Sequence, residues 1–497
     1  MKLLGLDTGT SGTRAVVIDQ HGRVLASATA AHADFASPQI GWAEQHPADW
    51  WRAATRAIPD CLAQAQLSPA EISGVGLTGQ MHGLVALDAA DRVVRPAILW
   101  CDQRTEAECR DLTAQLGAAQ LIELTSNPAL TGFTLPKILW MQKHEPELWS
   151  RVRSILLPKD YIRLCLTGER ATDVADASGT LLFDVAHREW SARMTEVAQL
   201  DASFLPRVFE SPQITGSISE RAAQETGLRP GIPVVAGAGD QAAGAVGMGI
   251  VQPGAVSATI GTSGVVFAAT GAPVRDPRGR IHTFCHAVPG HWHVMGVTQA
   301  AGLSLKWFRE QLLSGSNTPA PSYDQLTAEA AATPAGAEGL LWAPYLMGER
   351  TPHLDPNARG ALVGLSARHT RGHIVRAILE GVAFSLRDSL TIFSELNIPV
   401  TSIRLGGGGA RSPLWCQMQA DIYNGEVSVL QAEEGPAYGA ALLAGVGVGG
   451  WPSVEKACEL AVRVARRFRP DPERVAALQQ QYLRYARLYP ALRQLAQ

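Results

Sequence analysis

Short apolar runs alternate with helix-like stretches through much of the chain. The runs 72–77, 155–157 and 232–236 predict buried strands. By contrast, 48–67 is typical of a helix, and His373–Leu390 carries apolar residues at the four-residue step expected of a helix that packs on a sheet. Such alternation favours an α/β fold in which helices cover the faces of sheets.

The tetrapeptide Gly-Thr-Ser-Gly occurs twice, at Gly9–Gly12 and at Gly261–Gly264. Each copy separates two apolar, strand-like runs, which are 3–6 and 15–18 for the first copy and 256–260 and 265–267 for the second. Both copies therefore predict a hairpin whose tip offers backbone N–H groups and hydroxyls without bulk. Because glycines let the backbone approach an anion closely, each tip suits a phosphate. The repeat indicates a duplicated architecture in which two half-sites close on one polyphosphate.

The length and the distribution of small residues suggest where the chain divides. A chain of 497 residues exceeds what one hydrophobic core usually supports. The small-residue stretch Gly244–Gly249 is typical of a hinge, so we predict domains at 1–245 and 246–497. Residues Ser314–Pro334, rich in Ser, Thr, Pro and Ala, predict a surface excursion, and the tail after Trp451 has a helical, amphipathic pattern.

Composition and charge narrow the class of protein and its partners. Hydrophobic residues make up 46% of the chain and charged residues 18%, as in soluble globular proteins. The net charge of −3 gives no electrostatic reason to expect nucleic acid or an anionic membrane surface as a partner. The seven cysteines are scattered without a CxxC pair, which favours reduced thiols, and a strand begins at once after Met1. We therefore expect a cytoplasmic protein.

Asp7 closes the first predicted strand, directly before the first glycine turn. A carboxylate beside a phosphate is repelled unless a divalent cation lies between them. Mg²⁺ typically uses one or two carboxylates, waters and substrate phosphates, so Asp7 is a candidate Mg²⁺ ligand, directly or through water. The alternative is that Asp7 caps the turn. Thr10 and Ser11 add hydroxyls, and Arg14 adds a positive charge suited to phosphate unless it lies on the solvent face of its strand.

Asp240 follows the apolar run 232–236 and the small residues Gly237–Gly239. This places a carboxylate at the end of a predicted strand, on the rim where open α/β sheets bind ligands. We therefore predict that Asp240 is the general base that activates an alcohol to attack a γ-phosphate, the alternative being a helix N-cap. The run Gly406–Gly409 follows another predicted strand and would let a nucleoside approach closely.

Several of these motifs resemble those of the FGGY carbohydrate kinases, over almost the whole chain. Gly132–Trp140 and the stretch from Gly360 to Glu380 are similar to the two family signatures, and Asp7–Ser11 is similar to the first phosphate loop. The resemblance implies a two-domain, actin-like (ribonuclease-H-like) α/β fold with a central cleft for ATP and sugar. It implies Mg²⁺ as cofactor, Asp240 and Asp7 as catalytic residues, and Asp7 at the metal. The implied ATP-binding residues are Thr10, Ser11, Arg14, Gly261, Thr262, Ser263, Gly407 and Gly408.

Within the family, Gly79–Gly83 resembles the segment of the xylulose kinases whose Met-His pair contacts the sugar, whereas glycerol kinases carry an Arg-Glu pair there. This likeness implies D-xylulose as the sugar and D-xylulose 5-phosphate as the product, in D-xylose catabolism. The implied sugar-binding residues are Gln80, Met81, His82, Asp102, Asp240 and Gln241. One departure is Gln241, where xylulose kinases frequently carry asparagine.

The sequence leaves three alternatives open. The first is another sugar or polyol kinase on the same scaffold, acting on ribulose, gluconate or a related compound. The second is a nucleotide-gated interaction module of the actin type, against which Asp240 and the segment Gln80–His82 argue. The third concerns assembly, because a homodimer is compatible with everything above.

Overall fold

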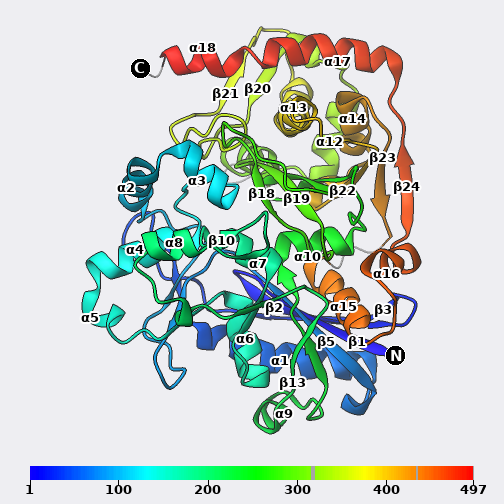
Figure 1. Cartoon of the computed structure of the whole chain (residues 1–497). Coiled ribbons are helices and arrows are strands. Elements are labelled where there is room, and N and C mark those ends of the chain that lie inside the picture. Colours follow the sequence, from blue (N-terminus) through cyan, green and yellow to red (C-terminus); the bar gives the residue numbers. More distant parts are fainter. Residues whose placement is uncertain (315–318, 432–434, 496–497) are drawn as a thin grey trace.

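The computed structural model describes residues 1–314, 319–431 and 435–495. Within these residues the chain forms two seven-stranded sheets, one in each half of the sequence, with helices on their faces. Figure 1 shows the first sheet, mostly in blue, in the lower part of the molecule and the second, running from green at β18 and β19 to orange-red at β24, in the upper part. The predicted α/β class is confirmed. Of the predicted surface excursion Ser314–Pro334, residues 315–318 lie outside the described part.

The first sheet has the order β13-β14-β5-β1-β2-β3, and β15 pairs with β5. Strands β1, β2 and β3 are antiparallel, whereas β5 runs parallel to β1. Thr8 at the end of β1 faces Thr13 on β2, so the first Gly-Thr-Ser-Gly segment is the hairpin turn that was expected. The strands are β1 (Lys2–Thr8), β2 (Gly12–Asp19), β3 (Val24–Ala31), β5 (Ile72–Gly79), β13 (Ile214–Ser217), β14 (Pro233–Val235) and β15 (Ala238–Gly239).

The second sheet repeats this arrangement, with the order β18-β19-β17-β16-β22-β23-β24. Strands β16, β17 and β19 are antiparallel, and β22 runs parallel to β16 just as β5 does to β1. The second Gly-Thr-Ser-Gly segment joins β16 to β17. The predicted duplication is therefore confirmed at the level of strand order. The strands are β16 (Ala255–Ile260), β17 (Gly264–Thr270), β18 (His282–Cys285), β19 (Trp292–Thr298), β22 (Ser402–Gly406), β23 (Val427–Leu430) and β24 (Val464–Phe468).

Helices cover both sheets, and those predicted at 48–67 and His373–Leu390 are present as α1 and α13. In the first half they are α1 (Pro47–Ala65), α2 (Glu106–Leu116), α3 (Ala118–Thr125), α4 (Thr134–His144), α5 (Pro146–Trp149), α6 (Pro158–Thr167), α7 (Val174–Ala177), α8 (Ala192–Val197), α9 (Glu220–Thr226) and α10 (Asp240–Gly247). In the second half they are α11 (Gly302–Trp307), α12 (Tyr323–Ala331), α13 (Arg371–Glu395), α14 (Pro413–Tyr423), α15 (Gly435–Gly447), α16 (Val454–Ala461), α17 (Pro472–Tyr485) and α18 (Leu488–Leu495).

Short two-stranded pieces connect these layers. They are β4 (Glu44–Gln45) with β7 (Ala97–Ile98), β6 (Val85–Leu87) with β8 (Ser154–Leu156), β9 (Ala171–Asp173) with β12 (Arg207–Phe209), β10 (Phe183–Asp184) with β11 (Glu189–Trp190), and β20 (Leu341–Ala343) with β21 (Ala361–Val363).

Helix α15 comes from the second half of the chain but packs on the first sheet. A side chain at Gly5 or Gly76 would overlap the backbone carbonyls of Ala437 or Ala440, so glycine is what lets the helix lie flat on the strands. Helix α15 also crosses α10 at Gly439, which meets the carbonyl of Ala243. The two halves are thus joined by packed backbone at the place where α10 begins its course between the sheets (Figure 1).

Three local expectations need correction or remain open. The tail after Trp451 is not helical throughout, because Val464–Phe468 forms the edge strand β24, with Val464 and Phe468 partly buried and the arginines between them exposed. Most of the small-residue stretch Gly244–Gly249 belongs to helix α10. The boundary between 1–245 and 246–497 stays a prediction.

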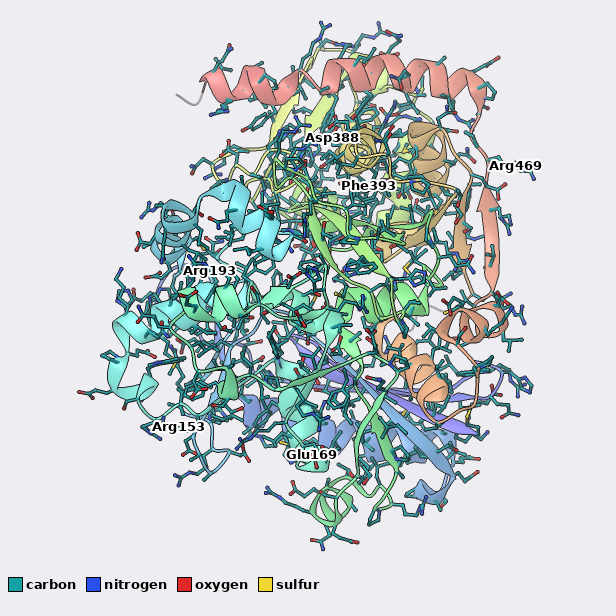
Figure 2. All side chains as sticks on the ribbon, viewed as in Figure 1. Arg153, Glu169, Arg193, Asp388, Phe393 and Arg469 are labelled. Carbon is teal, nitrogen blue, oxygen red and sulfur yellow. The ribbon has the colours of Figure 1, made fainter. Side chains whose placement is uncertain are left out.

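Charged side chains lie mostly at the surface and apolar side chains mostly in the interior, as expected for a globular protein. Figure 2 shows Arg153 and Arg469 at the periphery, whereas Phe393 lies within the upper part, where it is fully buried. No helix in the described residues combines the length and apolarity needed to span a membrane. All the cysteines lie in the described part, and none forms a disulfide.

Candidate active site

A pair of neighbouring cavities meets at the N-terminus of helix α10. The first, of about 220 Å³, lies between the two halves and includes Met81, His82 and Trp100 in its wall. The second, of about 350 Å³, is bordered by the glycine run after β22. Asp240 and Gln241 line both cavities, so a single carboxylate faces both spaces. The alternative that Asp240 is a helix N-cap is wrong, because Gly239 occupies the cap position and Asp240 is the first helical residue.

The carboxylates of Asp240 and Asp7 are electrostatically coupled. Burial raises the pKa of Asp240 to about 6, against hydrogen bonds from Gln241 that lower it. Burial also raises the pKa of Asp7 to about 7, the charge of Asp240 raises it further, and Arg14 on the neighbouring strand lowers it. Each carboxyl therefore holds its proton more tightly than a solvated one, chiefly because burial disfavours the charged form, and at Asp7 the charge of Asp240 adds to this effect.

Asp7 has the properties that a divalent cation requires. Its Oδ1 atom is buried and has no hydrogen-bond partner among the described residues, which is costly for a polar atom unless a ligand completes it. In the described part of the chain no three His, Cys, Asp or Glu side chains cluster closely enough to hold a metal by themselves. A site of one or two carboxylates completed by waters and phosphate oxygens is the arrangement that Mg²⁺ commonly adopts. The donor set thus fits Mg²⁺ that arrives with a phosphorylated substrate.

The first glycine turn lies beside the smaller cavity. The hydroxyl of Thr10 donates to Gln80 Oε1 at 3.2 Å and accepts from the indole N–H of Trp100 at 3.0 Å. Gln80 in turn donates to the carbonyl of Gly9 at 3.3 Å. Ser11 is exposed at the tip of the turn. These contacts tie the predicted phosphate-binding turn to the predicted sugar segment through Gln80 and Trp100.

The second turn reaches the smaller cavity, and the glycine run borders the larger one. Ser263 lines the smaller cavity, and the carbonyls of Gly261 and Thr262 accept hydrogen bonds from the first amides of α11. Gly407 and Gly408 line the larger cavity. Gly407 has φ +72° and a Cβ there would press on the Ile260 carbonyl, so a side chain is excluded on two grounds.

His82 is held in a strained conformation by the segment that contains the first family signature. Its φ of +67° lies in the left-handed region, which non-glycine residues rarely adopt. Its carbonyl accepts hydrogen bonds from the Thr134 hydroxyl at 3.0 Å and from Lys137 Nζ at 2.9 Å. Burial lowers the pKa of His82 to about 3, so the ring is neutral. Because Nδ1 faces the carbonyl of Gly179 at 2.7 Å and must donate to it, Nε2 is left to accept from a ligand hydroxyl.

Asp102 is held by contacts with the backbone and with Arg104. It is buried, accepts a hydrogen bond from the amide of Ala43 at 2.6 Å, and forms an ion pair with Arg104 at 2.7 Å. It is not among the residues that line the smaller cavity in the described structure, whereas Met81, His82, Asp240 and Gln241 are. The role of Asp102 in binding sugar stays a prediction, and in this structure its contacts organise the segment after Trp100.

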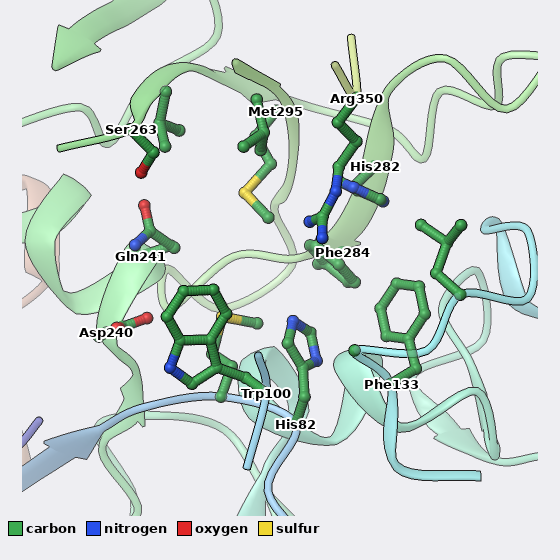
Figure 3. A pocket seen from close by; sticks show the side chains of 15 residues that line it. His82, Trp100, Phe133, Asp240, Gln241, Ser263, His282, Phe284, Met295 and Arg350 are labelled. Atoms are coloured by element: carbon green, nitrogen blue, oxygen red, sulfur yellow. The ribbon is translucent and has the colours of Figure 1, made fainter. Parts of the chain in front are cut away.

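Part of the cavity wall has no counterpart among the sequence-based candidates. It is built by residues with aromatic, thioether or charged side chains, which are Phe133, His282, Phe284, Met295 and Arg350 (Figure 3). Phe133 stands in the first family signature, Gly132–Trp140, but no role followed from that resemblance, and the other four residues lie outside both signatures. His282 and Phe284 alternate on β18 as any buried strand residues would, so periodicity alone carries no functional signal.

Two sheets of one topology, with a carboxylate between adjoining cavities, define a two-lobed enzyme that brings two substrates together. Models of the FGGY family of carbohydrate kinases match both halves, the N-terminal domain at residues 2–247 and the C-terminal domain at 256–448. The chain belongs to the FGGY family of carbohydrate kinases.

Individual members of the family are similar to this chain over nearly its full length. The chain is 40% identical to a xylulose kinase of Bacillus subtilis, over 98% of this chain and 96% of the relative. It is 40% identical to a xylulose kinase of Escherichia coli, over 98% and 99%. A crystal structure of xylulose kinase from Rhodospirillum rubrum superposes with a TM-score of 0.92 at 31% identity and covers 100% of this chain and 99% of that one. The two-domain sugar kinase fold implied by the sequence motifs is thereby confirmed.

Proposed function

We propose that this chain transfers the γ-phosphoryl group of ATP to the C5 hydroxyl of D-xylulose, giving D-xylulose 5-phosphate and ADP. In this reaction the sugar occupies the smaller cavity, and the nucleotide lies along the larger one with its phosphates near the second glycine turn and Asp7. The xylulose kinases that resemble this chain over their full length support the choice of sugar. We place the reaction in the cytoplasm, in keeping with the scattered cysteines.

The observation that carries the proposal is the position of Asp240. Its carboxylate faces both cavities, so an alcohol in one can lose its proton to Asp240 while attacking a phosphorus atom presented from the other. The bond from C5 oxygen to phosphorus forms as the bond from phosphorus to the ADP oxygen breaks, and the hydroxyl proton passes to Asp240. Enclosure of the sugar between the two halves excludes water as a competing acceptor.

The remaining work is positioning and neutralisation of charge. Mg²⁺, held by Asp7 directly or through water, would neutralise the phosphates when MgATP is bound. Arg14 places a positive charge next to Asp7, and Ser263 offers a hydroxyl at the junction of the cavities. His82 Nε2 accepts from a sugar hydroxyl, and Met81, packed against Gly239, fills the base of the cavity.

A panel of sugars tests the assignment directly. Purified protein is incubated with ATP, Mg²⁺ and, in turn, D-xylulose, D-ribulose, D-gluconate, glycerol or xylitol, and release of ADP is followed. We expect D-xylulose to give the highest kcat/KM, and mass and NMR spectra to place the phosphate on C5. A higher kcat/KM for another acceptor would reassign the substrate, and ATP-driven assembly without any phosphorylated sugar would favour the actin-like alternative.

A further inference from the structure

At the end of the sugar cavity away from Asp240, residues of the second half of the chain meet Phe133 of the first half. His282 and Phe284 come from strand β18, and Arg350 comes from the loop between β20 and β21. Figure 3 shows Arg350 and His282 directed into the cavity on one side, with Asp240 and Gln241 on the other. A ligand that reaches Asp240 with one end therefore meets Arg350 and His282 with its opposite end.

Arg350 is presented to this cavity by a fixed loop. The carboxylate of Glu349 accepts hydrogen bonds from the Thr298 hydroxyl at 2.6 Å, the Gln299 amide at 3.0 Å and the Arg350 amide at 2.8 Å. Thr351 donates its hydroxyl to the carbonyl of Arg280 at 2.8 Å. Across residues 1–314, 319–431 and 435–495, the guanidinium of Arg350 makes no hydrogen bond or ion pair. A rigidly held, half-buried guanidinium with unused donors is what a site for an oxygen-rich ligand requires.

His282 adds a second unused polar group beside Arg350. The side chain is only 2% exposed, and within the described structure its Nδ1 atom has no hydrogen-bond partner. The ring stacks on Phe284, with centroids 5.8 Å apart and planes inclined by 19°, and meets the edge of Phe133 at 5.7 Å. Burial, together with the charge of Arg350, lowers the pKa of His282 well below its usual value, so the ring is neutral. A neutral imidazole has one donor and one acceptor, as a hydroxyl group does.

We propose that Arg350 and His282 bind the carbonyl end of the ketose, Arg350 donating to the C2 oxygen and His282 hydrogen-bonding the C1 hydroxyl. This inference rests on the proposed function, which places the C5 hydroxyl at Asp240 and so directs C1 and C2 to the opposite wall. The chemistry matches group by group: a guanidinium only donates and a carbonyl oxygen only accepts, whereas an imidazole and a hydroxyl each do both. Sugar selection is then shared by both halves of the chain, with His82 on one side and Arg350 on the other.

The test compares two ketoses that differ only at C1. Arg350→Met and His282→Phe are assayed with D-xylulose and with 1-deoxy-D-xylulose, which keeps the carbonyl but lacks the C1 hydroxyl. Arg350→Met should lower kcat/KM about 10- to 100-fold for both ketoses, because it removes a charged hydrogen bond. His282→Phe should lower kcat/KM about tenfold for D-xylulose and leave that for 1-deoxy-D-xylulose within about twofold, because only the first substrate has the C1 hydroxyl.

Controls separate binding from folding. Arg368→Met removes an exposed arginine that pairs with Glu338 on the surface and should match the wild type. Arg350→Lys keeps the charge and should recover part of the loss, and the KM for ATP should stay unchanged in every variant. Equal losses on both ketoses in His282→Phe, or wild-type kinetics in Arg350→Met, would overturn the inference while leaving the proposed function intact. A wild-type protein that phosphorylates neither ketose would overturn the proposed function itself, and this inference with it.

Discussion

At the scale of single residues, the site depends on where a few polar atoms are left unsatisfied. Within the part of the chain that the structure describes, Asp7 and His282 carry buried polar atoms without hydrogen-bond partners, and the guanidinium of Arg350 makes no hydrogen bond, whereas the carboxylate of Asp102 is bonded by Arg104 and the backbone. Buried polar atoms normally find partners, so those that do not are candidates for ligand contact. Sequence motifs identified Asp7 and Asp240, because each follows a strand beside glycines. They missed His282, whose position at the cavity arises only from folding.

The replacement Asp240→Asn should remove the base and keep the shape of the site. We expect kcat to fall at least 100-fold, since general base catalysis contributes roughly 10²–10⁴-fold, with little change in ATP affinity. Turnover with D-xylulose and nucleotide binding by calorimetry measure the two effects. A turnover within a few-fold of the wild type would remove Asp240 from the chemistry.

The pH profile should report the ionisation of the same carboxylate. Burial raises the pKa of Asp240 to about 6, and only the ionised form can accept a proton from the sugar. Below about pH 6, kcat/KM should therefore fall about tenfold for each pH unit, measured at saturating Mg²⁺. Because a divalent cation favours the ionised form of nearby carboxyls, lower Mg²⁺ should move this limb to higher pH. A profile that stays flat down to pH 4.5 is incompatible with a base of this kind.

At the scale of elements, the site is held by the close crossing of helices α10 and α15 and by the buried side chain of Lys137. The paired hairpins were predictable because each Gly-Thr-Ser-Gly segment is flanked by apolar runs of strand length. Strand β24 was not, because a short edge strand that exposes its arginines resembles an amphipathic helix in composition. The crossing of α10 and α15 could not be predicted either, since a glycine in a helix gives no indication of what it touches.

Lys137 on helix α4 should matter for sugar binding although it touches no cavity. It is fully buried, its pKa is lowered to about 7 by burial, and it donates to the carbonyl of His82 at 2.9 Å. In Lys137→Met the strained backbone at His82 loses this contact, so we expect the KM for D-xylulose to rise about tenfold, with the KM for ATP unchanged. Lys143→Met, at an exposed lysine of the same helix, is the matched control. Equal KM values in the two variants would contradict this role.

Gly439 should be irreplaceable where α15 crosses α10. A methyl group there would overlap the carbonyl of Ala243, and overpacking at a site between two backbones costs about 3 kcal/mol or more. Gly439→Ala should lower the free energy of unfolding by that amount in chemical denaturation and reduce kcat, because α10 carries Asp240. Gly425→Ala, where the nearest atom would be 4.0 Å away, should be tolerated. Similar unfolding free energies for both variants would show that the crossing is not tightly packed.

At the scale of the whole molecule, two copies of one sheet topology face each other across the substrate cavities. The first half supplies Met81 and His82 to the smaller cavity, and the second supplies Ser263 to it and the glycine run at Gly407 to the larger one. In the proposed function each substrate contacts both halves, and such binding can drive domain closure and exclude water. The sequence predicted this division through the repeated glycine turns. The sequence could not predict that the two cavities meet at a single carboxylate, because this arrangement arises only when the chain folds.

The most direct test of the central claim is a crystal structure of Asp240→Asn with D-xylulose, Mg²⁺ and a non-hydrolysable ATP analogue. The account predicts the C5 hydroxyl within hydrogen-bond distance of residue 240, the γ-phosphate between the turns at Gly9–Gly12 and Gly261–Gly264, and the metal beside Asp7. A sugar bound outside the cavity of Met81 and His82, or a triphosphate that touches neither turn, would contradict it.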